Sequence, residues 1–445
     1  MSDHVYSVLV IGAGPAGLSV GYRLRELGQT DFLIVDMGDS LRRRGRYDPV
    51  DSICGVGGAG LFSDGKFSFF PSATGLWESF TPESLREGSD FVASLTKILP
   101  ADDPDGLPHG LPDDKRDEQT PTPSPTPSSE NGWSLKQYPS VYLSLEDRIK
   151  MIDHLTDRIG PERFRLRTRV TDIIREDDIY RVTTDTDTDV AYRARTVVIA
   201  GGRMFSVKRL KTFCPEYTFM RLEYGVRLTT DHRNAYFATP CVDPKYKKAG
   251  PASGPGSGPI GIEYRTFCCC RRGETVCSDY AGIKTFSGRA DCDPTDESNT
   301  GFNVRILDEK SAHDVAECLL TPGTDVFTGI PLSQVLRDGT HTKLRQCFGE
   351  LGEQYLVQGL RSLVGRFPCL SEARCSGPTV EGIGSYIATD QHMKVPGHDV
   401  WVVSDACGKY RGLTGAMVSG YCVGACVSGV EPRTQKSIQP LSSSG

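Results

Sequence analysis

The sequence predicts an α/β fold in which a discontinuous first domain is interrupted by an α+β domain built on an antiparallel sheet. Two apolar, β-prone runs at 6–11 and 32–36 enclose a helical pattern, as in a β-α-β unit. Further buried strands are predicted at 196–200 and 400–403, far apart in the chain. Between these two strands the pattern alternates, at 224–228, 262–267 and 302–306, which is typical of antiparallel strands. The chain therefore leaves the first domain and returns to it.

Segment boundaries follow from changes in composition. We expect residues 1–100, 134–205 and 376–430 to form the first domain and residues 206–375 to form the inserted one. A proline-rich acidic segment, 101–133, is predicted to be a disordered insertion, and 431–445 a flexible tail. Helical spacing predicts a helix at 145–159 and a buried helix at 416–430.

Charge and cysteine content limit the partners. The 445 residues carry a net charge of −6, which gives no broad basic surface for nucleic acid or anionic lipid. We therefore expect a small-molecule substrate, no nucleic acid and no membrane. Fifteen cysteines, an odd number, indicate free thiols, and the first ten residues lack a secretory signal, so a cytoplasmic location is predicted.

The glycine-rich loop after the first strand is the strongest motif. Gly12, Gly14 and Gly17 stand where a dinucleotide-binding loop needs a tight turn, close approach of the pyrophosphate and close helix packing. Pro15 and Ala16 begin the helix, whose amides would face the phosphates. Asp36 ends the second strand, where its carboxylate could accept hydrogen bonds from a ribose.

Two later strand ends favour FAD over NAD as the cofactor. The run 197–202 ends at Gly201 and Gly202, and the run 402–408 contains Asp405 just after a strand. These features resemble the glutathione-reductase superfamily, whose members have a Rossmann-type FAD-binding domain. The resemblance implies that Asp405 contacts the ribityl chain and that the helix at 412–417 faces the flavin pyrimidine edge.

Three further segments, 57–66, 265–270 and 405–420, carry a closer resemblance. They contain the elements GGAG-x-FSDGK and RTFC-x-C and resemble a poorly characterised family of FAD-dependent dehydrogenases. The chain departs from that family after Cys270, where Arg271 to Glu274 replace a Pro-Gly-Gly sequence. In addition to the residues named above, we predict that the following residues bind the cofactor: Gly58, Ala59, Gly60, Ser63, Asp64, Gly65, Lys66, Val170, Arg411, Gly412 and Leu413.

Three residues are candidates for catalysis. Lys66 could place positive charge near a reduced flavin or an anionic substrate, and the alternative is a solvated lysine. Arg265 could bind a substrate carboxylate with both arms of its guanidinium, and the alternative is a surface salt bridge. Glu381 could be a base, and the alternative is a carboxylate that supports a turn.

The run Cys268, Cys269 and Cys270 allows a redox disulfide, a metal site or buried packing. Alternate residues of a strand share a face, so Cys268 and Cys270 should point the same way. No C-x-x-C pair or nearby histidine accompanies them. We predict a structural role and no metal site.

The resulting hypothesis is an FAD-dependent oxidoreductase that oxidises a small metabolite by hydride transfer to flavin, with reoxidation by oxygen or a partner. One alternative is an NAD(P)H-dependent flavin monooxygenase, and a second is a flavin-binding scaffold or sensor without turnover. The segment 254–259 follows no clear strand, so it supplies no second dinucleotide-binding loop.

Overall fold

The computed structural model describes residues 4–70, 72–96, 130–136, 138–185, 191–207, 212–213, 215–238, 243–250, 261–337 and 341–429. Most of the predicted proline-rich insertion, the glycine-rich segment 254–259 and the tail lie outside the described residues.

The first sheet has seven strands in the order β6-β2-β1-β9-β8-β7, and β18 also pairs with β9. Their bounds are β1 (Val5–Ile11), β2 (Phe32–Val35), β6 (Phe164–Arg165), β7 (Val170–Glu176), β8 (Ile179–Thr184), β9 (Ala191–Ile199) and β18 (Val400–Val402). β6, β2, β1, β9 and β18 run parallel to one another, whereas β7 and β8 are antiparallel. The predicted Rossmann-type core is confirmed.

The carboxyl ends of four parallel strands meet at one edge of this sheet. The Gly12 amide donates to the Val35 carbonyl over 2.7 Å, the Ala200 amide to the Ile11 carbonyl over 2.8 Å, and the Val403 amide to the Ile199 carbonyl over 3.0 Å. Open α/β sheets bind ligands at this edge, where the strand order reverses. The loops after β1, β2, β9 and β18 are therefore placed to form a site.

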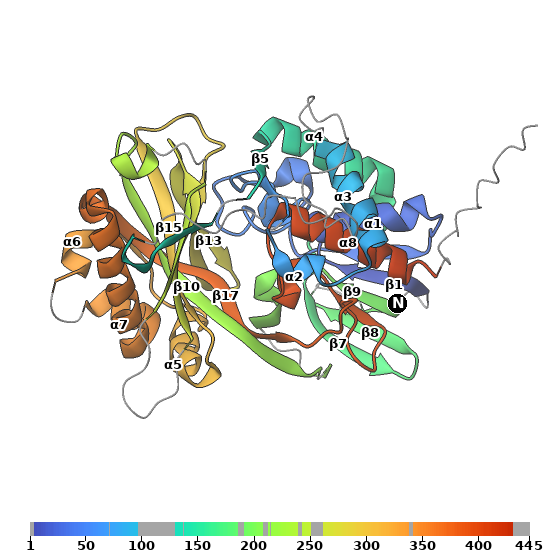
Figure 1. Ribbon diagram of the computed structural model, residues 1–445. Helices are drawn as coiled ribbons and strands as arrows, with labels where there is room; N and C mark the ends of the chain where they lie inside the picture. The colour runs from blue at the N-terminus through green and yellow to red at the C-terminus, as the bar shows by residue number, and fades with distance from the viewer. Residues whose placement is uncertain are drawn as a thin grey trace, which may run out of the picture.

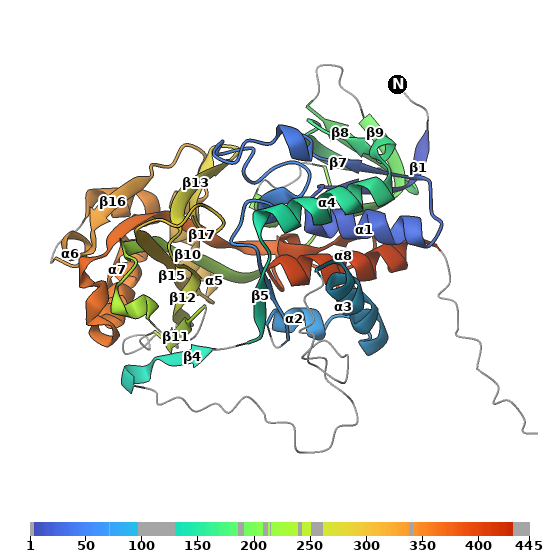
Figure 2. The same ribbon diagram turned by 90° about the horizontal axis from the view of Figure 1, so that it is seen from above.

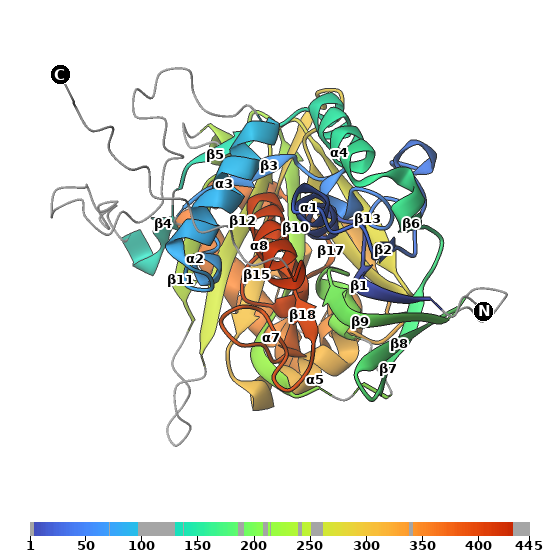
Figure 3. The ribbon, with the colours of Figure 1, turned by 90° about the vertical axis from the view of Figure 1, so that its right-hand side faces the viewer.

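Helices cover the first sheet. They are α1 (Pro15–Glu26), α2 (Thr74–Trp77), α3 (Pro82–Thr96), α4 (Leu145–Ile159) and α8 (Leu413–Val427). Figure 2 shows α1, α4 and α8 running side by side, and Figure 3 shows α8 against α1. The predicted helix at 145–159 is confirmed, and the buried helix predicted at 416–430 begins earlier and ends at Val427.

The second sheet is antiparallel and has the order β16-β17-β10-β15-β12-β11-β4. Its strands are β16 (Phe327–Pro331), β17 (Arg374–Ile387), β10 (Tyr217–Asp231), β15 (Glu297–Ile306), β12 (Ile262–Cys270), β11 (Lys245–Ala249) and β4 (Ser134–Lys136). There are also two two-stranded antiparallel sheets: β13 (Glu274–Tyr280) pairs with β14 (Ile283–Arg289), and β3 (Lys66–Ser68) pairs with β5 (Ser140–Tyr142).

One face of the second sheet is apolar. Leu222, Tyr224, Tyr264, Phe302 and Val304 belong to its buried core. Three helices pack against this core, namely α5 (Glu309–Leu319), α6 (Leu332–Val335) and α7 (Thr342–Arg366). Figure 1 shows them on the side away from the first domain. Because side chains alternate along a strand, the other face points toward the first domain.

The domain boundaries differ from the predicted ones at three places. β17 pairs with β10 along its length, so the chain returns to the first domain after Ile387 and not at 376. β4 pairs with β11, which puts 134–136 in the second sheet. Trp133 is 2% exposed and belongs to the second core, so the predicted insertion ends before it. In each case a long-range pairing overrides the local pattern.

Among the described residues, we find no helix with the length and apolar character needed to cross a lipid bilayer.

The approach of α1 to β1 depends on Gly17. A Cβ atom there would lie 1.9 Å from the Gly12 carbonyl oxygen. We expect Gly17→Ala to lower the free energy of unfolding in urea by about 1–3 kcal/mol, the usual cost of overpacking. Gly365→Ala in α7 is the control, because a Cβ atom there meets open space, and we expect it to stabilise by about 0.5–1 kcal/mol. Equal effects of the two substitutions would contradict this packing account.

Candidate functional site

A cavity of about 730 Å³ lies between the carboxyl edge of the first sheet and the charged face of the second. This volume is within the usual range for cofactor sites. All predicted site residues line the cavity except Gly17 and Gly65. Segments that are far apart in the chain, 11–16, 58–66, 200–205 and 404–416, thus meet around one space.

The glycine-rich loop presents open backbone to the cavity. Gly14 is the residue before α1, with extended φ and ψ of −71° and −179°. A Cβ atom at Gly14 would meet only the Cα atom of Gly58, at 3.7 Å. The start of α1 therefore has room for a ligand group beside its unpaired amides, which attract anions.

Asp36 supports this loop directly. Its Oδ2 atom accepts from the Ala13 amide over 2.7 Å, and its Oδ1 atom accepts from the Gly38 and Gly55 amides, each over 2.8 Å. A carboxylate has about four acceptor sites. One acceptor position remains, so the predicted ribose contact stays a prediction.

The loop that contains Gly58, Ala59 and Gly60 is held by two buried arginines that the sequence did not single out. Arg44 donates to the Val56 carbonyl over 2.7 Å and to the Gly58 carbonyl over 2.9 Å. Burial lowers the pKa of Arg44 to about 10.

The second of these arginines is Arg148 of α4, which is 1% exposed. It donates to the Leu61 carbonyl over 2.5 Å and to the Ser63 carbonyl over 3.0 Å, and it pairs with Asp291 over 2.8 Å. Both arginines act on backbone carbonyls that are distant in sequence, so no local pattern could have found them.

Lys66 is not a solvated lysine. Its Nζ atom pairs with Asp243 and its side chain is 10% exposed. Desolvation by burial opposes the charged form, but the carboxylates of Asp243 and Asp64 outweigh it and raise the pKa of Lys66 well above its usual value. Lys66 lines the cavity as a fixed positive charge.

Asp405 lines the cavity and carries a buried acceptor that no described residue uses. Its Oδ2 atom lies 3.4 Å from Arg203 Nε. Its Oδ1 atom is buried and has no hydrogen-bond partner among the described residues. Burial raises the pKa of Asp405 to about 6, and Arg203 partly opposes that shift. A buried acceptor without a partner is costly, so a ligand hydroxyl at this place would be favourable.

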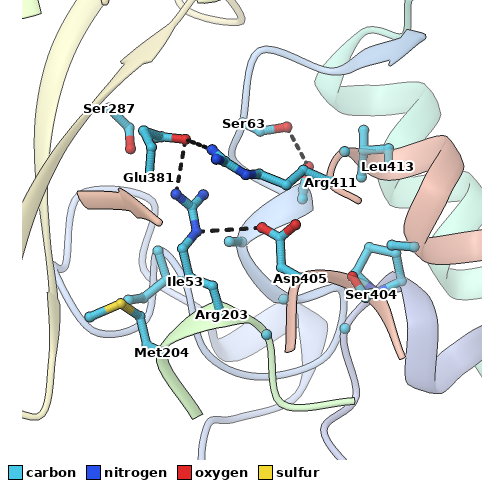
Figure 4. A pocket seen from close by; sticks show the side chains of 18 of the residues that line it. Ile53, Ser63, Arg203, Met204, Ser287, Glu381, Ser404, Asp405, Arg411 and Leu413 are labelled. Atoms are coloured by element: carbon cyan, nitrogen blue, oxygen red, sulfur yellow. Dashed lines mark hydrogen bonds and ion pairs between the residues drawn. The ribbon is translucent and has the colours of Figure 1, made fainter. Parts of the chain in front are cut away.

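Glu381 connects two arginines of the first domain to the second sheet. Its Oε2 atom lies 2.9 Å from Arg203 Nη1 and 2.9 Å from Arg411 Nη1. Figure 4 shows these side chains converging from different elements, with Arg203 also directed at Asp405. The geometry gives Glu381 a positioning role in place of the predicted turn support, and its role as a base stays a prediction.

Arg265 is part of a buried ion cluster and not of a surface salt bridge. Its Nη1 atom lies 3.6 Å from Glu223 Oε1, and Glu223 is 1% exposed. The same Oε1 atom accepts from Arg221 over 3.2 Å and from Arg305, and Oε2 pairs with Arg411. Glu223, Arg221 and Arg305 belong to no local sequence motif, because only strand pairing brings them together.

The cysteine run departs from a regular strand. Cys268 has φ of 46°, and the pairing of β12 with β15 shifts between Phe267 and Cys270. The Sγ atoms of Cys268 and Cys270 nevertheless lie 3.6 Å apart, on one side as predicted. Cys268 also lies 3.3 Å from Asp64 Oδ2, so these three groups bring a carboxylate oxygen and two sulfur atoms together.

The environment of Cys268 favours a protonated thiol. The hydrogen bond with Cys270, burial and the Asp64 carboxylate raise its pKa well above the usual value. Redox exchange and metal binding both use the thiolate. This supports a packing role, and the absence of a metal site stays a prediction.

No protein-family model matches the chain. No curated protein sequence matches it either, so the family resemblance rests on its motifs.

Solved structures give distant likenesses. Tetracycline destructase Tet(51) is 13% identical, with 96% of this chain and 82% of that chain covered and a TM-score of 0.38. A flavoprotein/dehydrogenase from Cytophaga hutchinsonii is 12% identical, with 96% and 78% covered and a TM-score of 0.39. NikD, an amino acid oxidase of nikkomycin biosynthesis, is 14% identical, with 96% and 94% covered and a TM-score of 0.45. None of the three is similar enough to assign a function to this chain.

The cavity residues fit FAD on two observations of this structure. Gly14 leaves open space at the helix start, where a pyrophosphate would lie. Asp405 has a buried acceptor where the resemblance expects a ribityl hydroxyl. The α8 amino terminus, after Gly412, lines the same cavity. Apart from Gly17 and Gly65, the predicted FAD-binding residues are therefore arranged around one cavity.

If Gly14 faces the pyrophosphate, a branched side chain there should exclude it. We expect purified wild-type protein to release about one FAD per chain on denaturation and Gly14→Val to release at most about one tenth of that amount, measured by chromatography. Gly365→Val is the control, because its site in α7 is remote from the cavity lining. Full FAD content in Gly14→Val would contradict the assignment of this loop.

Proposed function

We propose that the protein is an FAD-dependent oxidoreductase that oxidises a small organic molecule by hydride transfer to flavin, with reoxidation by oxygen or a partner. One observation carries the proposal: Gly14, with its open backbone, and Asp405, with a buried acceptor that has no partner among the described residues, line the same cavity from separate strand ends. FAD is a long ligand with a phosphate part and a polyhydroxyl chain, and it matches both features.

The first domain would hold the cofactor through backbone groups. The amides at the start of α1, near Pro15 and Ala16, would bind the pyrophosphate. Asp36 would use its remaining acceptor for the ribose, and Asp405 Oδ1 would accept from the ribityl chain. The start of α8, at Gly412 and Leu413, would favour negative charge at the pyrimidine edge.

Bound FAD would supply the hydride acceptor, and the protein would supply binding, orientation and electrostatics. Arg203, Glu381 and Arg411 form a rigid ion-paired bridge beside Asp405. This bridge would keep the substrate side of the cavity in a fixed geometry. Lys66, held by Asp243, would add positive charge without moving. A fixed site of this kind reduces the entropy lost on reaching a reactive geometry.

The type of oxidoreductase can be tested by anaerobic mixing. We expect NADPH alone to leave the flavin absorbance of the holoprotein unchanged over minutes, whereas one or more members of a panel of small organic donors bleaches it. Rapid bleaching by NADPH without substrate would contradict the proposal and favour a flavin monooxygenase. Bleaching by neither class would favour a flavin-binding scaffold or sensor.

A further inference from the structure

Basic side chains are concentrated on the charged face of the second sheet. Five of the basic side chains that this sheet contributes to the cavity lining form what we call the cationic wall: Lys136, Arg221, Lys245, Arg265 and Arg305. They come from five consecutive strands of the sheet, in the order β10, β15, β12, β11 and β4. The wall is therefore built by the sheet and does not depend on a loop.

Strand pairing forces like charges together in this wall. Within the wall, Lys245 is directly opposite Lys136. Lys247, which lies outside the wall and pairs with Glu263, is directly opposite Arg265. Like charges directly opposite in an antiparallel pair destabilise a sheet. An arrangement of this kind is favourable when an anion binds between the cations.

The carboxylates of the fold satisfy only part of the wall. Glu223 contacts Arg221, Arg265 and Arg305 of the wall and also Arg411, so one charge serves four guanidinium groups. Glu263 lies 3.4 Å from Arg305, and Asp243 lies 3.5 Å from Lys245. Lys136 pairs with none of the described carboxylates, and Arg265 makes only its 3.6 Å contact with Glu223 and no side-chain hydrogen bond among the described residues.

The pKa values of two wall residues, Lys136 and Arg305, are lowered. Burial, and then Arg265 and Lys245, lower the pKa of Lys136. Burial, Arg265 and Arg221 lower the pKa of Arg305 to about 9. The charged forms of Lys136 and Arg305 are thus made less stable by cationic neighbours, so a bound anion would relieve both repulsions.

The wall is continuous with the proposed flavin site. Glu223 contacts Arg265 on one side and Arg411 on the other, and Arg411 pairs with Glu381. An anion on the wall would therefore belong to a molecule that also reaches the flavin part of the cavity. Glu223 and Glu263 lie within the same face and would repel a dianion more than a monoanion.

We propose that the cationic wall binds a carboxylate of the substrate, with Arg265 and Lys136 as its main contacts, so that the enzyme acts on carboxylic acids. Guanidinium groups match the two oxygens of a carboxylate, which orients the molecule as well as attracting it. This inference deepens the proposed function and rests on it.

The test is a titration of the holoprotein with benzoate and with benzamide, its neutral isostere, followed by calorimetry and by the flavin absorbance spectrum. We expect benzoate to bind and to perturb the spectrum, and benzamide to bind at least ten-fold more weakly. Arg265→Met and Lys136→Met should each weaken benzoate binding by about ten- to hundred-fold, the usual range for a charge-assisted contact.

Lys248→Met is the matched control. Lys248 lies on β11, between the strands that carry Arg265 and Lys136, but its Nζ atom donates to Ser362 of α7 over 2.8 Å, on the helix side of the sheet. It should leave benzoate binding unchanged. Thermal unfolding of each variant shows whether it is folded, and Lys136→Met, on a short terminal strand of the sheet, remains informative if Arg265→Met fails to fold.

Three results would overturn the inference: equal binding of benzoate and benzamide, no effect of either wall substitution, or tighter binding of inorganic phosphate than of benzoate. The third result would identify a phosphate group as the anion. If the protein holds no FAD, the proposed function fails, but calorimetry with benzoate still tests the wall. If FAD is bound and reducible and benzoate does not bind, only the inference fails.

Discussion

The geometry of the cavity depends on the ion pairs of the buried Glu223 carboxylate. Glu223 lies in β10 of the second sheet, yet Arg411, which precedes α8 of the first domain, reaches it. A buried charge without a partner is strongly destabilising, so Glu223 requires the guanidinium groups around it. Those groups come from both domains. The ion cluster therefore fixes the distance between the carboxyl edge of the first sheet and the charged face of the second.

The same constraint explains why the site is built from backbone on one side and from charged side chains on the other. The first domain presents strand ends and the helix start after Gly14, which suit phosphate and ribose groups. The second domain presents a sheet face whose opposite side is fully used in packing α5, α6 and α7. Only the face toward the cavity is available for polar chemistry, and the sheet places arginine and lysine there.

Local sequence patterns predict the parts of the fold that are determined by neighbouring residues, such as strand ends and amphipathic helices. The loop at Gly12 and Gly14, the helix at 145–159 and the acid at Asp405 each follow from a strand end or a period of hydrophobic residues. The predicted return to the first domain, at residue 376, is too early. The glycines between 377 and 384 resemble a turn, but this segment belongs to the strand β17.

Residues whose roles depend on long-range contacts were not predictable in this way. Arg44 and Arg148 hold carbonyls of a loop through tertiary contacts, and neither belongs to a motif. Glu223 and Arg305 meet only through the pairing of β10 with β15. The backbone of Cys268 adopts a positive φ inside a strand, which an alternating pattern does not reveal.

A crystal structure of the purified holoprotein would test the central claim most directly. The account predicts FAD in the cavity, with its pyrophosphate beside Gly14, a ribityl hydroxyl donating to Asp405 Oδ1, and the flavin ring between the start of α8 and the pair Glu381 and Arg411. Electron density for FAD at another place, or a ribityl chain with no contact to Asp405, would contradict it.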